Sequence, residues 1–368
     1  MRKLLPASLV ALLLLTACNG AGSAEDPGEG ELRPFTFVAA AAVALPNEQV
    51  AVYAVGKEYG FFEEEGLEVD LQFADGSTAA VQAVASGSAD VTGADVSAVL
   101  SAGQQGVPVK AVGGLVQNWP WVIAVLPDSD IQSGEDLAGR SIGVISLASG
   151  SNPYARAFVE AHGLVPEQDV GIVPVGIGQP AAAAIEQGDV DAIAMFTQVY
   201  ATLENAGFQF RYLDNPPQFD LLRSLVFTVP NDMIENDPEV VSAFGRAAYR
   251  ALLFSAANPE AAMRAGYAQM PDLLPDSGDP EENLDNDVRA LQAWIDTAVP
   301  TEGEPADWGD WGDISQPEWD ATQQFTVDAG TIDGPVDLAQ VWDPSLLDQM
   351  NDWDRAEVLE LAADPQAG

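Results

Sequence analysis

The stretch G76-S-T-A-A-V-Q-A-V-A-S-G-S-A-D-V91 decides the fold of this 368-residue chain. An alanine-rich helix opens after Gly76 and ends at Gly87, and Asp90 leads into a new strand. The same passage from helix to strand recurs 101 residues later, at Gly188 and Asp191. Chance similarity of two turns is one explanation. We interpret the recurrence as two similarly built α/β lobes, because the repeats of a solenoid would be shorter and more numerous.

Strands and helices alternate outward from this stretch, which predicts an α/β fold with parallel sheets and short crossovers. Apolar or alternating runs mark the strands, and apolar residues at helical spacing mark the helices. The predicted strands are 35–44, 67–73, 141–145, 170–175, 192–196, 208–213 and 224–229, and predicted helices include 48–59, 238–257 and 284–298. The stretch 300–315, rich in Gly, Pro, Trp and Asp, is expected to be an irregular loop.

The chain is expected to cross twice between the lobes. Residues 34–122 would form the first part of lobe I, 123–223 would form lobe II, and 224–368 would return to lobe I and add C-terminal helices. Two crossing segments make a hinge with a cleft beneath it. This arrangement favours a protein that closes on a ligand.

The N-terminus is typical of an export signal. Arg2 and Lys3 precede an apolar run, 9–15, that is too short to span a membrane as a helix. The string L15-T-A-C18 resembles the bacterial lipobox, whose cysteine is lipidated and becomes the first mature residue. We therefore expect a lipoprotein signal peptide over 1–17, a lipid anchor at Cys18 on the outer face of the cytoplasmic membrane, and a flexible tether over 18–33. An ordinary signal peptide with an incidental cysteine is the alternative.

Charge and composition exclude several classes of protein. The chain has 57 Asp and Glu against 14 Lys and Arg, a formal net charge of -43, so it lacks the cationic surface that nucleic acid requires. A single Cys and a single His exclude disulfide frameworks and zinc sites built from several such ligands. Self-repulsion among so many carboxylates indicates adaptation to a saline medium, although a generally acidic proteome would give the same composition.

Four further strings carry a family resemblance: V50-A-V-Y-A-V-G-K-E-Y-G-F-F-E-E-E-G-L-E-V69, D136-L-A-G-R-S-I-G-V144, A184-I-E-Q-G-D-V-D-A-I193 and W319-D-A-T-Q-Q-F-T-V-D-A-G-T-I-D-G-P-V-D337. With residues 76–91, they resemble the substrate-binding proteins of ABC importers that serve nitrate, sulfonates, taurine and thiamine-precursor pyrimidines. The resemblance covers nearly the whole mature chain. It implies a type II periplasmic-binding-protein fold, a ligand cleft between two α/β lobes, and a membrane permease as the partner.

Three helix N-termini are expected at the cleft, after residues 75–78, 149–152 and 178–180. Ligands of open α/β sheets lie at the carboxyl ends of the strands, and free backbone N–H groups there suit a carbonyl, a ring nitrogen or an anion. Plain N-capping by the same side chains is the alternative. The candidate ligand-binding residues are Asn47, Ser77, Thr78, Asp95, Asn118, Trp119, Trp121, Ser149, Ser151, Asn152, Tyr154, Gln179 and Phe196.

The segment Asn118-Trp119-Pro120-Trp121 lies at the expected first crossing, where an indole ring would stack on a flat ligand or pack the hinge. Cations are few near the cleft, and only Arg156 and Arg223 are placed to enter it. We therefore favour a flat heterocycle, such as a thiamine-precursor pyrimidine, over a sulfonate, taurine or nitrate. The protein is expected to be a monomer that needs neither a cofactor nor a metal.

Catalysis is not expected, although relatives with this fold include desulfinases and a pyrimidine-forming synthase that depend on Cys or His. Cys18 is assigned to the lipid, and His162 falls at the last turn of a helix, where an imidazole contacts free carbonyls. The many carboxylates allow weak calcium binding, but no EF-hand spacing occurs in the sequence. A ligand-free adhesive lipoprotein is a third class, which would not explain two matched lobes.

Overall fold

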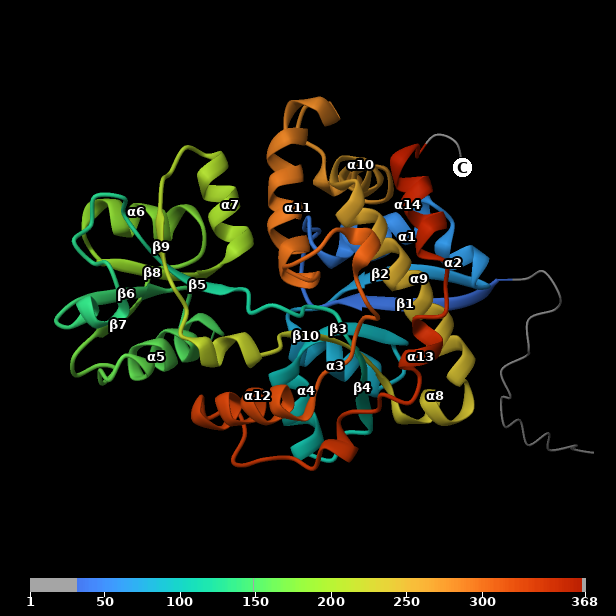
Figure 1. Ribbon diagram of the computed structural model, residues 1–368, viewed down its shortest axis with the longest axis horizontal. Coiled ribbons are helices and arrows are strands. Elements are labelled where there is room, and N and C mark those ends of the chain that lie inside the picture. Colours follow the sequence, from blue (N-terminus) through green and yellow to red (C-terminus); the bar gives the residue numbers. More distant parts are fainter. Residues whose placement is uncertain (1–31, 148, 366–368) are drawn as a thin grey trace, which may run out of the picture. The chain divides into compact units, whose positions relative to one another are not determined.

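The computed structural model describes residues 32–147 and 149–365, in which two five-stranded sheets form the centres of two lobes (Figure 1). The sheet of lobe I has the strand order β2 (Leu67–Phe73), β1 (Arg33–Ala39), β3 (Val91–Asp95), β10 (Leu225–Pro230) and β4 (Val109–Gly114). The sheet of lobe II has the order β7 (Gly171–Pro174), β6 (Ser141–Val144), β8 (Ala192–Phe196), β5 (Trp121–Val125) and β9 (Arg211–Leu213). The predicted signal peptide and the lipidation site Cys18 lie outside the described residues.

The two sheets share one topology, and each is mixed rather than parallel. Strand β10 runs antiparallel to β3 and β4, and β5 runs antiparallel to β8 and β9. The parallel-sheet prediction is therefore wrong at these two strands. Each follows a crossing from the other lobe and starts at the carboxyl edge of its new sheet, where Leu225 pairs with Asp95 and Trp121 with Phe196. A strand that enters from that edge has to run against its parallel neighbours.

Several predicted elements agree with the structure at both ends, namely β2, β8, α9 (Pro238–Ala257) and α11 (Leu284–Ala298). The strand predicted over 35–44 is too long, because its partner β2 ends at Phe73, opposite Ala39. The helix predicted over 48–59 begins as a buried π-helix, Gln49–Ala54, and continues as α1 (Val55–Glu58). Arg33, expected at the end of the tether, is the first residue of β1.

Helices cover both sheets. Those of lobe II are α5 (Ser151–Ala161), α6 (Gln179–Gln187) and α7 (Thr197–Asn205). Those of lobe I are α2 (Phe61–Glu64), α3 (Ser77–Ala85), α4 (Val96–Gln104), α8 (Asn231–Asn236), α10 (Pro259–Gln269), α12 (Gln316–Asp328), α13 (Leu347–Met350) and α14 (Arg355–Ala363), with α1, α9 and α11. Short 3₁₀ helices occur at Gly134–Leu137, Pro217–Leu221, Pro271–Leu273, Pro280–Glu282, Pro305–Asp307 and Leu338–Gln340.

The C-terminal part of the chain holds the lobes together from two sides. Helix α11 packs against α7 of lobe II, and α12 packs between α4 of lobe I and the 3₁₀ helix Pro217–Leu221 of the second crossing (Figure 1). The helix prediction around His162 is confirmed, because its Nδ1 lies 2.8 Å from the carbonyl oxygen of Phe158 at the end of α5.

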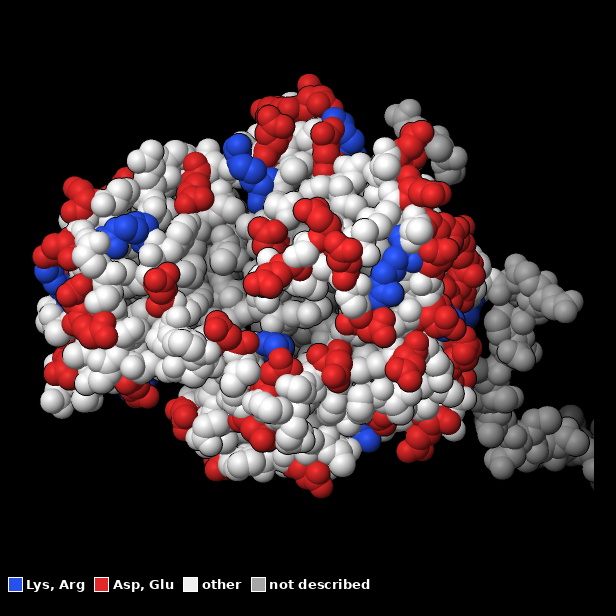
Figure 2. Space-filling view, in the orientation of Figure 1, with Lys and Arg blue, Asp and Glu red and all other residues white. Residues whose placement is uncertain are grey.

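Acidic side chains outnumber basic ones across the face shown in Figure 2. In the described ranges, no helix has both the length and the apolar character needed to cross a membrane.

Candidate ligand-binding site

A pocket of about 590 Å³ lies between the two lobes, at the carboxyl ends of their strands. Lobe I contributes the start of α3 and the turn from β3 to α4, and lobe II contributes the loop before α5 and the first residue of β5. Helix α12 forms a further wall. The volume is within the range of about 300–1,000 Å³ that is typical of small-molecule sites.

Aromatic rings form the lobe II side of the pocket. Trp121 begins β5 opposite Phe196, and its ring contacts Phe196 edge to face, with 5.5 Å between centroids. Trp119 precedes it and packs edge to face on Phe325 of α12 at 5.2 Å. Tyr154 lies behind both indoles, at 6.3 Å from Trp119 and 6.2 Å from Trp121. Rings held by other rings make a rigid apolar wall, which suits a flat ligand.

The N-terminus of α5 approaches Trp121 closely because its N-cap residue is Gly150. A Cβ atom at that position would come within 2.9 Å of Trp121 Cζ2. The loop before the helix is held by hydroxyl groups: Ser149 Oγ donates to the carbonyl of Ser146, and Ser151 Oγ accepts from the N–H of Ile145. No side chain caps α5, and the N–H of Asn152 in its first turn donates to the carbonyl of Ser149 at 3.1 Å.

Two buried polar atoms in the pocket wall have no hydrogen-bond partner among the described residues, Trp119 Nε1 and Asn152 Oδ1. The first is a donor and the second an acceptor. The Asn152 side chain is fixed in this orientation, because its Nδ2 donates to the carbonyl of Leu147 at 2.9 Å. A ligand that offers an acceptor and a donor would pair these two atoms; five further buried side-chain polar atoms, among them Nε1 of Trp308, Trp311 and Trp319, are unpaired elsewhere in the described residues.

The lobe I side is polar. Ser77 Oγ accepts from the N–H of Asp95 at 3.0 Å, which ties the start of α3 to the end of β3. Asp95 caps α4 by accepting from the N–H of Ser97 at 2.9 Å, and it also accepts from Ser224 Oγ at 3.3 Å. Burial raises the pKa of the Asp95 carboxyl, and the bonds from Ser97 and Ser224 oppose that rise. Thr78 is exposed at the first turn of α3.

Helix α12 supplies the third wall and engages the cation of the pocket. Arg223 forms an ion pair with Glu318 of α12, and the backbone N–H of Arg223 donates to Thr322 Oγ1 at 3.0 Å. Burial lowers the Arg223 pKa and Glu318 opposes this, so the guanidinium charge is balanced inside the pocket wall. Among the described lining residues, Arg223 is the one cation and Asp95 the one carboxylate.

The structure brings seven of the predicted ligand-binding residues to this pocket: Ser77, Thr78, Asp95, Trp119, Trp121, Ser149 and Asn152. These residues are far apart in the sequence. They belong to four connections next to different strands, and the fold brings those connections together. Their role in binding remains a prediction.

Four predicted residues near the cleft have structural partners instead. Asn47 Oδ1 accepts from the N–H of Gln49 at the start of the π-helix. Asn118 donates to the carbonyls of Asp296 and Val299, which fastens the first crossing to the end of α11. Ser151 and Tyr154 are fully buried behind the pocket wall.

The remaining two predicted residues lie elsewhere. Gln179 is exposed at the start of α6. Phe196 lines a separate, mainly apolar space of about 520 Å³ between α7 and α11. The edge-to-face contact between Phe196 and Trp121 places the Phe196 ring next to the main pocket without exposing it there.

Sequence reasoning missed the contribution of α12 and of α4. The missed lining residues of these two helices and of the turn after α12 are Ser97, Ala98, Ser101, Thr322, Phe325, Thr326, Ala329 and Thr331. Ser97 follows Asp95 at the carboxyl end of β3, so the rule that ligands lie at strand ends could have found it. Nothing in the local sequence of α12 shows that this C-terminal helix returns to the cleft.

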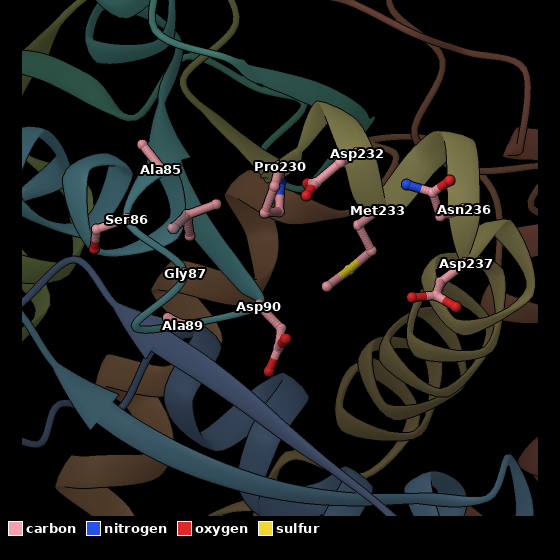
Figure 3. A pocket seen from close by; sticks show the side chains of 11 residues that line it. Ala85, Ser86, Gly87, Ala89, Asp90, Pro230, Asp232, Met233, Asn236 and Asp237 are labelled. Atoms are coloured by element: carbon pink, nitrogen blue, oxygen red, sulfur yellow. The ribbon is translucent and has the colours of Figure 1, made fainter. Parts of the chain in front are cut away.

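A second hollow, of about 360 Å³, lies at the opposite end of the lobe I strands (Figure 3). It is lined by the end of α3, by Asp90 just before β3, and by α8, from which the Met233 side chain extends into the hollow. The carboxylate of Asp90 already has a hydrogen-bond partner within the protein, because it accepts from the N–H of Thr36 at 2.7 Å. This is the amino end of β3, where open α/β sheets do not bind ligands.

No group of three or more metal-ligating side chains was found among the described residues.

Comparison with known proteins places the chain in a family. Residues 47–262, more than half of the chain, match the model of the NMT1/THI5-like family. The riboflavin-binding protein RibY of Chloroflexus aurantiacus is 28% identical over 352 residues, which cover 92% of this chain and 96% of RibY. The formylaminopyrimidine-binding protein of Halalkalibacterium halodurans is 28% identical over 262 residues, 69% of this chain and 75% of that protein.

The fold agrees with solved structures of binding proteins. The periplasmic aliphatic sulphonate-binding protein SsuA of Escherichia coli superposes with a TM-score of 0.62 at 18% identity, over 85% of this chain and 93% of SsuA. At that identity the likeness shows the fold alone, and it confirms the predicted periplasmic-binding-protein architecture. The chain belongs to the NMT1/THI5-like family and has the fold of the substrate-binding proteins of ABC importers.

Proposed function

We propose that this protein is the extracytoplasmic solute-binding component of an ABC importer and that its ligand is a flat, uncharged heterocycle. The observation that carries the proposal is the unpaired donor and acceptor, Trp119 Nε1 and Asn152 Oδ1, in the same pocket as Trp121. A ring with an amide-like edge would pair with both atoms while its face lies on the indole wall. The polar lobe I side would then orient the ring's other edge.

Charge supports a neutral ligand over a sulfonate, taurine or nitrate. A cation strengthens the binding of an anion, and the cation in the pocket wall, Arg223, is already paired with Glu318. Asp95 would also repel an anion from the lobe I side. The helix N-termini of α3 and α5 favour an anion weakly and suit a carbonyl oxygen equally well.

The named ligands of two relatives support the same chemistry, whereas a third relative, of Escherichia coli, is named for binding taurine. RibY and the formylaminopyrimidine-binding protein are named for nitrogen heterocycles that carry ring or amide donors and acceptors. Both relatives are named as binding proteins, which agrees with the expectation that this chain is not an enzyme. In the proposed role, the lobes close on the solute, and the protein, held at the membrane through Cys18, delivers it to a permease.

The test is a ligand screen by thermal unfolding of the purified protein in molar salt. The panel is riboflavin, formylaminopyrimidine, thiamine, taurine, an alkanesulfonate and nitrate. A ligand at about a hundred times its Kd should raise the free energy of unfolding by roughly 2.7 kcal/mol. We expect this shift with a heterocycle and not with an anion. A shift with taurine, the sulfonate or nitrate alone would overturn the proposal of a neutral ring.

A further inference from the structure

Exposed apolar side chains gather at the cleft edge of both sheets. Four of the large apolar side chains that are exposed among the described residues lie at or just after the carboxyl ends of parallel strands, namely Val43, Phe73, Leu147 and Ile177. They are between 45% and 61% exposed. Apolar side chains that are exposed together at one edge mark a contact surface. We call these four residues the apolar rim.

The rim residues occupy equivalent positions in the two lobes. The sheets share one strand order, in which β1 of lobe I corresponds to β6 of lobe II and β2 corresponds to β7. Val43 lies in the loop after β1, and Leu147 lies in the loop after β6. Phe73 ends β2, and Ile177 follows β7. Each lobe therefore carries one rim residue on its edge strand and one after the neighbouring strand.

The loop of Val43 lies across the cleft from the loop of Ile177. Leu45 and Pro46, which follow Val43, line the apolar space of about 520 Å³ together with Ile177. Gln198 of α7 in lobe II also donates from Nε2 to the carbonyl of Pro46 at 3.0 Å. These contacts hold the two loops on opposite sides of one space.

The loop of Phe73 lies across the cleft from the loop of Leu147. Gly76 and Ser77, which follow Phe73, line the main pocket, and so do Leu147 and Ser149 of lobe II. In both places, the loop after an edge strand faces the loop after the second strand of the other lobe. The rim therefore forms two facing pairs, Val43 with Ile177 and Phe73 with Leu147.

The rim loops carry almost no charge, in contrast to the chain as a whole. The formal net charge is -43, yet residues 40–46, 74–76, 145–147 and 175–178 include one charged side chain, Asp75. Two acidic lobes repel each other as they approach. A rim with few carboxylates weakens that repulsion at the place where the lobes meet, and contact between its apolar side chains removes apolar surface from water.

We infer that the apolar rim makes two contacts when the lobes close, Val43 with Ile177 and Phe73 with Leu147, and that these contacts hold the closed state over the ligand. All four side chains are exposed in this structure, so the contacts are not made here. The inference rests on the proposed function, because it assumes that the lobes close on a solute. It adds the residues that stabilise closure, whichever ligand the pocket binds.

The test is disulfide cross-linking in the full-length protein with Cys18→Ser, which removes the one cysteine of the sequence. The matched variants are Val43→Cys with Ile177→Cys and Phe73→Cys with Leu147→Cys. The exchanged variants, Val43→Cys with Leu147→Cys and Phe73→Cys with Ile177→Cys, combine the same positions in the other pairing. A disulfide requires Cα atoms within about 7 Å, so it reports which pairs meet.

With no ligand added, in molar salt, we expect the matched pairs to cross-link at least about tenfold faster than the exchanged pairs, because a two-lobed protein samples its closed state. Riboflavin, formylaminopyrimidine and taurine are then added in turn. A compound that raises the thermal stability of the protein should accelerate cross-linking of the matched pairs and not of the exchanged pairs.

Ile177→Ser tests whether apolar contact, and not proximity alone, favours closure. In the variant with Phe73→Cys and Leu147→Cys, it should slow cross-linking about fivefold, because burial of Ile177 no longer stabilises the closed state. Val165→Ser is the matched control, since Val165 is also 49% exposed and precedes β7 at the opposite edge of the sheet. Equal slowing by the two substitutions would contradict a role for the rim.

The outcomes separate the inference from the function on which it rests. Equal rates for matched and exchanged pairs, or no cross-link in any pair, would overturn the rim contacts. A compound of the panel that still stabilised the protein would then leave the proposed function standing. Cross-links in the matched pairs alone, in a protein that no compound of the panel stabilises, would support the rim contacts and count against the flat-ring ligand.

Discussion

The two lobes have the same strand order, yet they give the pocket opposite chemistry. Lobe II presents indole rings, Trp119 and Trp121, backed by buried Tyr154. Lobe I presents hydroxyl groups and the carboxyl of Asp95. The topology decides where a ligand can lie, because both sheets turn their carboxyl edges to the cleft. The residues at those edges decide what can bind, with apolar contact from one lobe and orientation from the other.

Lobe I also keeps a buried carboxyl near its cleft edge, and removing it is the largest effect that we expect. Glu48, just before the π-helix, is 4% exposed, and burial raises its pKa to about 7. Below pH 4.5 the carboxyl is protonated in both folded and unfolded chains. As the pH rises to 7 the unfolded chain ionises first, so this group lowers stability progressively.

Glu48→Gln should therefore leave the free energy of unfolding unchanged at pH 4. Above pH 7 the variant should be more stable than the wild type by about 3 kcal/mol. Chemical denaturation between pH 4 and 8 measures the difference. Glu63→Gln, which removes an exposed carboxyl on α2, controls for the loss of one charge. A difference that does not change with pH would contradict a raised pKa at Glu48.

Trp121→Ala tests whether the indole wall of lobe II contacts the ligand. Loss of a central aromatic contact costs about 2 kcal/mol, so the affinity for the heterocycle that binds should fall about 30-fold. Calorimetry on the folded variant measures this. Trp353→Ala removes an indole outside the cleft and should leave affinity unchanged. If Trp121→Ala and Trp119→Ala both bound normally, the indole wall would have no part in recognition.

Asn118→Ala tests whether this residue serves to fasten the crossing to α11 or to contact the ligand. It loses two bonds, at 2.9 Å to Asp296 O and 2.7 Å to Val299 O. The free energy of unfolding should fall by about 1.5 kcal/mol, with less than a twofold change in ligand Kd. An unchanged stability with a large loss of affinity would return Asn118 to the binding site.

The smallest effect is expected on the polar side, from Thr78→Val. The substitution keeps the side-chain shape and removes one exposed hydroxyl at the start of α3. A neutral hydrogen bond contributes about 1 kcal/mol, so affinity should fall about fivefold. Thr301→Val, in an exposed loop, is the control. A loss as large as that of Trp121→Ala would show that lobe I contributes more than orientation.

Local pattern predicted much of the fold. The helices Pro238–Ala257 and Leu284–Ala298 and the strand Leu67–Phe73 were predicted to the residue, because their apolar periodicity continues to a clear end. The antiparallel placement of β5 and β10 could not be read in this way. A strand's direction depends on the edge from which the chain enters the sheet, and that is set by residues far apart in the sequence.

Only part of the candidate site could be predicted from the sequence, because local patterns do not show which distant segments meet. The sequence by itself determined two α/β lobes, the polar helix starts at Ser77 and Ser149, and the indoles of the first crossing, since these are local signals. Only the tertiary structure brought α12 against Trp119 and paired Arg223 with Glu318. Such contacts join segments more than 90 residues apart, and packing and charge pairing over that separation leave no periodic trace in the chain.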